Sequence, residues 1–129
     1  MAFASFVNLF CEDLDRLTVY YAGLFGFDEI PENRSPTFRS LRSGECRLGL
    51  SARSACSYLG MSEFPAGSPS TCLLTLQVED IGTVDQLATL AVELGGALLK
   101  APADTPYGWR QAVLADPEGN AFRISALLS

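Results

Sequence analysis

The sequence predicts an α+β fold in which one supersecondary unit is used twice. The stretch Glu12-Asp13-Leu14 opens a helix-like run that closes at Gly26, and Glu79-Asp80-Ile81 opens a similar run that closes at Gly95-Gly96. The interval from Asp13 to Asp80 is 67 residues, about half of the 129-residue chain. Each half would bury its apolar face against its copy, and such a pair leaves a groove that can bind a ligand.

The first half has the pattern of a strand, a helix and three further strands. Residues 5–10 alternate in character, as expected of a strand with one buried face. Asp13 suits the N-cap of the helix, and Gly26 suits the left-handed residue after its end. The helical stripe consists of Leu14, Leu17, Tyr21 and Leu24. The later strands are expected at Phe27–Ile30, Thr37–Leu41 and Arg47–Ser51.

The second half repeats this order. Its expected elements are a strand at Cys72–Val78, a helix over about Gly82–Leu94, and strands at Ala97–Lys100, Trp109–Ala115 and Ala121–Ala126. The intervening segment 52–70 is rich in Ser, Gly and Pro and is long for a connector, so it either crosses between the modules or covers the groove. We therefore expect one domain, 1–129, with modules over about 5–51 and 71–127.

Composition and charge limit the possible partners. The formal net charge of −6 repels phosphate groups, which argues against nucleic acid and anionic membranes, although it could simply keep a small protein soluble. No apolar run approaches the ~18 residues that a membrane span needs, and no signal peptide precedes the first strand, so a cytoplasmic protein is expected. The cysteines are expected to be buried and reduced; they are Cys11, Cys46, Cys56 and Cys72.

The expected strands have one apolar face and one mixed face. Pairs such as Val7 with Leu9 and Phe122 with Ile124 should pack beneath the helices. The mixed face could be a solvated sheet surface or the lining of a cup. It comprises Phe6, Asn8, Phe10, Arg47, Gly49, Ser51, Leu73, Thr75, Gln77, Ala121, Arg123 and Ser125.

Several motifs from about Ser5 to Ala126 resemble those of a known superfamily. They include Tyr20-Tyr21, Leu24-Phe25-Gly26-Phe27, Val78-Glu79-Asp80-Ile81 and, above all, Asp116-Pro117-Glu118-Gly119-Asn120 before Phe122-Arg123-Ile124. The chain resembles the vicinal oxygen chelate superfamily of glyoxalase I, bleomycin-resistance proteins and extradiol dioxygenases. Tyr107-Gly108-Trp109-Arg110 is similar to the antibiotic-binding branch. The resemblance implies two tandem βαβββ modules that form a U-shaped, barrel-like cup, commonly completed by a homodimer partner.

Members of this superfamily usually hold a divalent metal ion through His and Glu side chains. Carried over to this chain, the ligand positions fall near Phe6, Gly49, Leu73 and Arg123, none of which is a metal ligand. The chain has no histidine, and the mixed face as assigned above carries no carboxylate. An arginine at the last position opposes metal binding. We therefore expect no metal, no other cofactor and no catalytic residue.

The second half offers three candidate ligand contacts. Trp109 and Tyr107 could stack on a planar or cationic ligand, although Trp109 could equally fill the core. Arg123, together with Arg47 of the first half, could hold a carboxylate or phosphate of the ligand. The two arginines could instead pair with acidic residues at a dimer interface.

The first half and the connector offer four more candidates. Phe6 and Phe10 would form the apolar floor of the cup. Tyr58 and Met61 would cover an apolar ligand, or would merely cover exposed core.

Three classes of function remain open. The leading one is a metal-independent protein, similar to bleomycin-resistance proteins, that sequesters a small organic molecule in a groove. The second is a metal-dependent lyase or dioxygenase of the same superfamily. The third is a dimeric module that takes no small-molecule ligand.

Overall fold

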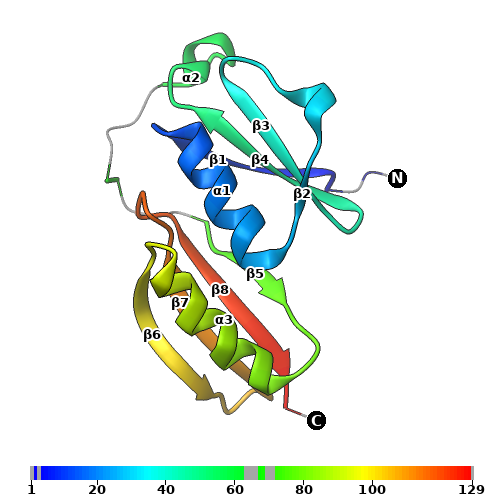
Figure 1. Cartoon of the computed structure of the whole chain (residues 1–129), viewed down its shortest axis with the longest axis vertical. Helices are drawn as coiled ribbons and strands as arrows, with labels where there is room; N and C mark the ends of the chain where they lie inside the picture. The colour runs from blue at the N-terminus through cyan, green and yellow to red at the C-terminus, as the bar shows by residue number, and fades with distance from the viewer. Residues whose placement is uncertain (1, 3, 63–66, 69–71, 129) are drawn as a thin grey trace. The chain divides into compact units, whose positions relative to one another are not determined.

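The computed structural model describes residues 2, 4–62, 67–68 and 72–128, in two compact units, Met1–Ser68 and Pro69–Ser129 (Figure 1). The first unit contains β1 (Phe6–Cys11), α1 (Leu14–Phe25), β2 (Asp28–Glu29), the 3-10 helix η1 (Pro31–Asn33), β3 (Phe38–Ser43), β4 (Cys46–Ala52) and α2 (Ala55–Tyr58). The second contains β5 (Leu74–Gln77), α3 (Ile81–Glu93), β6 (Ala97–Asp104), β7 (Trp109–Ala115) and β8 (Ala121–Leu127). Among the described residues, no helix is long and apolar enough to span a membrane.

Both units have the same sheet topology. The strand orders are β1-β4-β3-β2 and β5-β8-β7-β6. In each sheet the first strand pairs in parallel with the last strand of its unit, and the other pairs are antiparallel. The predicted βαβββ order is thus confirmed twice. Neither sheet, as described, closes into a barrel.

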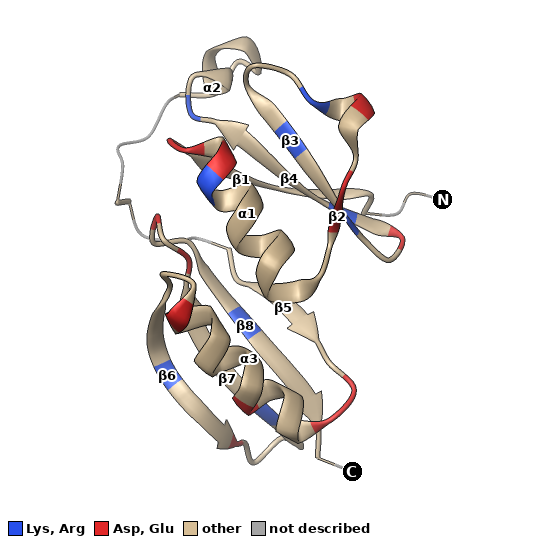
Figure 2. Cartoon of the chain, viewed as in Figure 1, with Lys and Arg blue, Asp and Glu red and all other residues tan. Residues whose placement is uncertain are grey.

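The repeated Asp residues begin both long helices. Acidic residues, red in Figure 2, lie at the start of both helices. The carboxylate of Asp13 accepts a hydrogen bond from the Arg16 amide at 3.0 Å, and that of Asp80 accepts one from the Thr83 amide at 2.8 Å. This backbone bond, with a second from the Thr83 hydroxyl, holds the pKa of Asp80 below its usual value. After α1, Gly26 adopts a left-handed φ of 72°, as predicted.

One face of each sheet is buried beneath a long helix. In the first unit, α1 packs on β3 and β4 and covers Leu41 and Leu50, which are fully buried. In the second, α3 packs on β6, β7 and β8 and helps to bury Phe122 and Ile124. Each such side chain contributes about 1.5–3 kcal/mol to folding when fully buried. The opposite face of each sheet takes no part in this packing against the helix.

One expectation about where a strand ends was wrong. Strand β6 continues through Pro102 to Asp104, whereas it was expected to end at Lys100. Proline is tolerated there because β6 is an edge strand whose register shifts between Leu98 and Lys100 and again between Lys100 and Ala103. The segment after the first module contains the short helix α2.

The cysteines are free, but not all are buried. Cys11 and Cys56 are buried as predicted. Cys46 is half-buried, and Cys72 is exposed because β5 begins only at Leu74, two residues later. The expectation of four buried cysteines was therefore wrong for these two.

The turn between β7 and β8 is organised by the buried Asp116. Its Oδ1 atom accepts hydrogen bonds from the amides of Glu118 at 2.8 Å and Asn120 at 3.0 Å, and its Oδ2 accepts one from the Asn120 side chain at 2.9 Å. Gly119, with a φ of 89°, donates its amide to the Asp116 carbonyl at 2.9 Å. The Asp-Pro-Glu-Gly-Asn motif thus fixes a turn.

We predict that Asp116→Ala lowers the free energy of unfolding by about 2–4 kcal/mol, because charge-assisted hydrogen bonds are lost from a buried carboxylate. Asp116→Asn should cost less, since its one acceptor oxygen can keep both bonds to backbone amides. Urea denaturation of the two variants measures the difference. Equal losses in both variants would contradict the hydrogen-bond account.

Candidate functional site

Three cross-strand rows of side chains line the face of the first sheet opposite α1, which we call the open face. Because directly paired residues share a face, the strand register defines these rows. The first row is Asp28, Arg42, Arg47 and Phe6; the second is Ser40, Gly49 and Asn8; the third is Phe38, Ser51 and Phe10. The mixed face that the sequence assigned to β1 and β4 is therefore confirmed.

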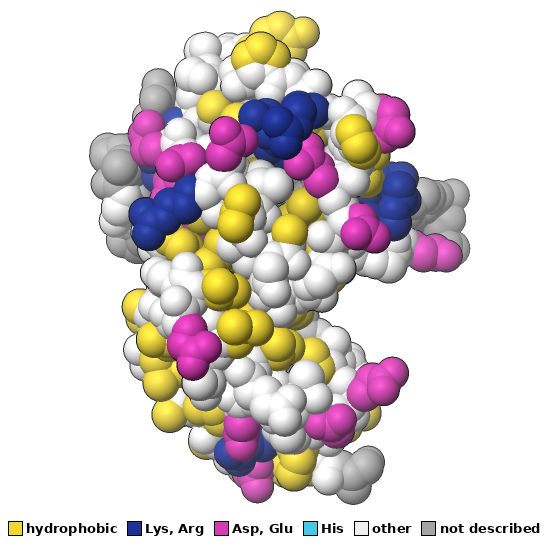
Figure 3. Space-filling model, viewed as in Figure 1, with side chains coloured by type: hydrophobic (Ala, Val, Ile, Leu, Met, Phe, Trp, Pro, Cys, Tyr) yellow, Lys and Arg dark blue, Asp and Glu magenta, His cyan; other side chains and the backbone are white. Residues whose placement is uncertain are grey.

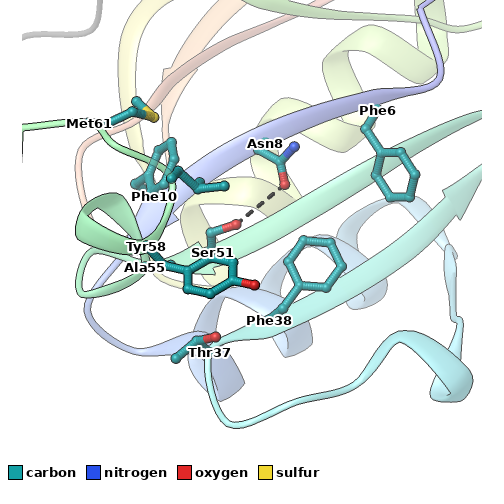
Figure 4. A pocket seen from close by; sticks show the side chains of 10 residues that line it. Phe6, Asn8, Phe10, Thr37, Phe38, Ser51, Ala55, Tyr58 and Met61 are labelled. Carbon is teal, nitrogen blue, oxygen red and sulfur yellow. Dashed lines mark hydrogen bonds between the residues drawn. The ribbon is translucent and has the colours of Figure 1, made fainter.

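A pocket of about 620 Å³ opens on this face, wholly within the first unit (Figure 4). Four of the predicted ligand contacts line it together: Phe6, Phe10, Tyr58 and Met61. The other lining residues are Asn8, Thr37, Phe38, Ser51, Ala55 and Leu59. Sequence reasoning missed Phe38, although its alternation with Arg39 and Leu41 could have placed it on the open face.

Gly49 allows Asn8 and Phe38 to approach each other closely above β4. A Cβ atom at this position would overlap the Asn8 carboxamide and would lie 3.0 Å from Phe38 Cε1. Across β4, the ring centroids of Phe6 and Phe38 are 6.3 Å apart with an interplanar angle of 53°. The glycine thus lets side chains from both neighbouring strands close over β4.

Asn8 and Ser51 supply polar atoms in this otherwise mostly apolar pocket. The Ser51 hydroxyl and the Asn8 Oδ1 atom form a hydrogen bond of 3.3 Å (Figure 4). Within the described part of the chain, the Asn8 side-chain nitrogen has no hydrogen-bond partner. It can therefore donate to a ligand that enters the pocket.

The short helix α2 and the residues after it carry apolar side chains that are exposed although they line the pocket. Tyr58 is 92% exposed, Leu59 56% and Met61 45%. The segment is nevertheless anchored, because Cys56 is fully buried and its carbonyl accepts a hydrogen bond from the Met61 amide at 2.8 Å. A bound molecule would cover these side chains without requiring the backbone to rearrange.

Arg47 is not a lining residue but lies directly beside the pocket. Its guanidinium carbon is 5.6 Å from the centroid of the Phe6 ring, a cation–π geometry. Phe6 therefore both lines the pocket and contacts the guanidinium of Arg47.

The other three predicted residues belong to the second unit. Register places Trp109 and Arg123 on the face opposite α3, where Arg123 Nε donates to Thr75 Oγ1 at 3.1 Å. The Tyr107 hydroxyl accepts a hydrogen bond of 2.9 Å from Gln111 on the same face. Arg47 and Arg123 thus lie on different sheets, and their joint action on one ligand stays a prediction.

The donor set does not fit the metal site that the fold usually carries. The register partner of Gly49 is Asn8, not Phe6, so this position pairs a neutral amide with a residue that has no side chain. Among the described residues, no three His, Cys, Asp or Glu side chains form a group that could hold a metal ion. The expectation that the mixed face lacks a carboxylate needs one correction, since the register places Asp28 of the edge strand β2 beside Arg42.

Known structures share this fold over almost the whole chain. A glyoxalase/bleomycin resistance protein/dioxygenase family enzyme from Burkholderia phytofirmans PsJN is 40% identical, with a TM-score of 0.90 over 96% of this chain and 98% of that one. A glyoxalase-related enzyme from Fulvimarina pelagi is 21% identical, with a TM-score of 0.85 over 98% of this chain and 88% of its own. Lactoylglutathione lyase from Agrobacterium tumefaciens is 18% identical, with a TM-score of 0.76 over 98% and 94%.

The family assignment comes from the sequence as well. A search of curated proteins finds no match to this chain. The model of the glyoxalase-like domain matches residues 5–125, which include all the strands described above except the last two residues of β8. The chain therefore belongs to the glyoxalase-like domain family, within the glyoxalase, bleomycin resistance protein and dioxygenase superfamily.

Proposed function

We propose that this chain is a metal-independent binding protein that sequesters a small organic molecule in the pocket of its first unit. The observation that supports this most directly is the pocket of about 620 Å³ lined by aromatic and aliphatic side chains. Ligand sites typically have volumes of about 300–1,000 Å³, mostly apolar walls and a few polar groups that orient the ligand. Asn8 and Ser51 are such groups, and Tyr58 offers a large exposed surface for a ligand to bury.

For the second unit by itself, we propose the ligand contacts predicted from the sequence. Trp109 and Tyr107 would stack on planar groups, and Arg123 would bind an acidic group. We further propose that the protein is a cytoplasmic homodimer. It would act like an antibiotic-resistance protein, by binding a compound before the compound reaches its target. These extensions are supported by family membership and by the open face of the second sheet.

Catalysis is the second candidate function. It is favoured by the Burkholderia phytofirmans relative, which is 40% identical and is called a family enzyme. Against a metal-dependent lyase or dioxygenase stand the absence of histidine from the sequence and the Asn8–Gly49 pair. The third candidate, a dimeric module without a small-molecule ligand, would leave the exposed pocket wall without a purpose.

We expect metal removal to leave ligand binding unchanged. The purified chain should contain less than one divalent metal ion per chain, as measured by inductively coupled plasma mass spectrometry. Its affinity for a neutral aromatic probe, 2-naphthamide, should be the same by calorimetry before and after dialysis against EDTA. A stoichiometric metal ion whose removal abolishes binding would favour the enzymatic candidate instead.

Tyr58→Ala should weaken the binding of 2-naphthamide about tenfold, because an aromatic wall that the ligand buries is lost. The free energy of unfolding should change by less than about 0.5 kcal/mol, since Tyr58 is 92% exposed in the free chain. Calorimetry and urea denaturation measure the two quantities.

Val19→Ala is the matched control, because Val19 is 71% exposed on α1, on the other side of the sheet. It should change neither affinity nor stability. If Tyr58→Ala lowered the stability and left the affinity intact, Tyr58 would be a structural cover and not a ligand contact.

Gly49→Ala should distort the pocket, because its new methyl group displaces the Asn8 carboxamide and crowds Phe38, and both of these residues line the pocket. We predict lower stability and weaker binding of 2-naphthamide in this variant. In the double variant with Asn8→Ala, the space is restored, and part of the stability should return as a coupling of about 0.5–3 kcal/mol. Strictly additive losses in the cycle of denaturation experiments would contradict this packing.

A further inference from the structure

A row of charged side chains crosses the open face at the edge of the first-unit pocket. Register places Arg42 between Asp28 and Arg47, and Phe6 follows Arg47 on the next strand. Two guanidinium groups therefore face one carboxylate, which leaves the row with one unit of positive charge. Like charges directly opposite each other on neighbouring strands are destabilising. Such an arrangement is favourable once an anion joins it.

The other side of the same unit is arranged differently. There, Arg39 pairs with Asp15 at 3.1 Å. Figure 3 shows acidic and basic side chains lying next to one another on this α1 side. Elsewhere in the unit, Arg53 pairs with Glu12 at 2.7 Å and Arg34 with Glu29 at 2.8 Å. Three of the six arginines of this unit thus form an ion pair with a carboxylate among the described residues.

Arg47 departs from this pattern. Among the described residues, no carboxylate forms an ion pair with it, and its charged group lies over the face of Phe6. A guanidinium that stacks on a ring through its flat face keeps its N–H groups at the edge, where they match the two oxygens of a carboxylate. Phe6 also lines the pocket, so an aromatic ligand on Phe6 would bring its acidic group to Arg47.

We propose that the first-unit pocket selects aromatic carboxylates, with the ring among Phe6, Phe38 and Tyr58 and the carboxylate on Arg47. This specificity depends on the proposed binding function. The chain as a whole carries a net charge of −6, so its general field disfavours an anion, and a local positive charge is needed to bind one. A cationic aromatic ligand would be repelled by the positive charge of Arg47.

Three probes of one shape test this specificity: naphthalene-2-carboxylate, 2-naphthamide and 2-naphthylmethylammonium, titrated into the full chain by calorimetry at low ionic strength. We expect the carboxylate to bind about tenfold or more tightly than the amide, because it adds charge-assisted hydrogen bonds. The ammonium compound should bind most weakly. The preference for the carboxylate should diminish as salt is added.

Arg47→Gln should lower the affinity for the carboxylate to that of the amide and leave the affinity for the amide unchanged, which also shows that the variant is folded. Arg16→Gln on α1 removes the same charge away from the pocket and should affect neither probe. An amide or ammonium compound that binds as tightly as the carboxylate would overturn the specificity and leave the binding function intact. Equal losses of both affinities in Arg47→Gln would also overturn it. If none of the three probes bound, the binding function itself would fail.

Discussion

Each sheet of this fold is covered by one long helix, and this single contact decides which face of the sheet belongs to the core. A four-stranded sheet with a single covering helix must place its apolar residues on one face, as Leu48 and Leu50 do on β4. Removing these side chains from water is the main favourable contribution to folding. The alternate residues lie on the opposite face and outside that core, so the core does not determine their chemistry. Both units obey this constraint, and both therefore retain an open face.

In the first unit, the open face carries a glycine beneath two close side chains. A glycine inside a strand ordinarily weakens it, because it provides nothing to pack and loses more backbone entropy on folding. At position 49 this cost is offset by the close approach of Asn8 from β1 and Phe38 from β3. The glycine thus brings together two of the residues that line the pocket. Local departures from strand-forming rules are expected at functional sites.

Much of the fold could be predicted because it is written in local chemistry. Asp13 and Gly26 bracket a helix by well-understood capping geometry, and alternation along β1 separates Leu9 from Asn8 without any tertiary information. The repeat then transfers each inference to the second half. Element boundaries were less predictable, because an edge position lets β6 continue through Pro102, which a central strand would not tolerate.

The site was less predictable than the fold, for a physical reason. Phe6, Phe10, Tyr58 and Met61 were found as candidates, since large apolar side chains on a mixed face or in a polar segment stand out. Alternation with Arg39 and Leu41 could have assigned Phe38 to the open face, but its place in the pocket depends on neighbours from other strands, such as Phe6. The same holds for the charge on Arg47, whose meaning comes from cross-strand neighbours and not from its place in the sequence. The site is formed by contacts between residues of different strands, whereas the helices and strands are determined by residues close together in the sequence.

The two copies of the unit differ most where folding constrains them least. Their helix-covered faces are alike in burying leucine in both units, as Leu50 and Leu114 show. Their open faces differ, since the first has aromatic rings around Gly49, whereas the second joins Arg123 to Thr75 and Gln111 to Tyr107 through hydrogen bonds. The hydrogen bonds of the second unit link side chains of one face to each other, while the first unit combines an exposed apolar wall with a guanidinium that has no carboxylate partner among the described residues. A ligand with an apolar part and a negative charge would cover this wall and pair with this guanidinium. The first unit is therefore the part of the fold best suited to binding.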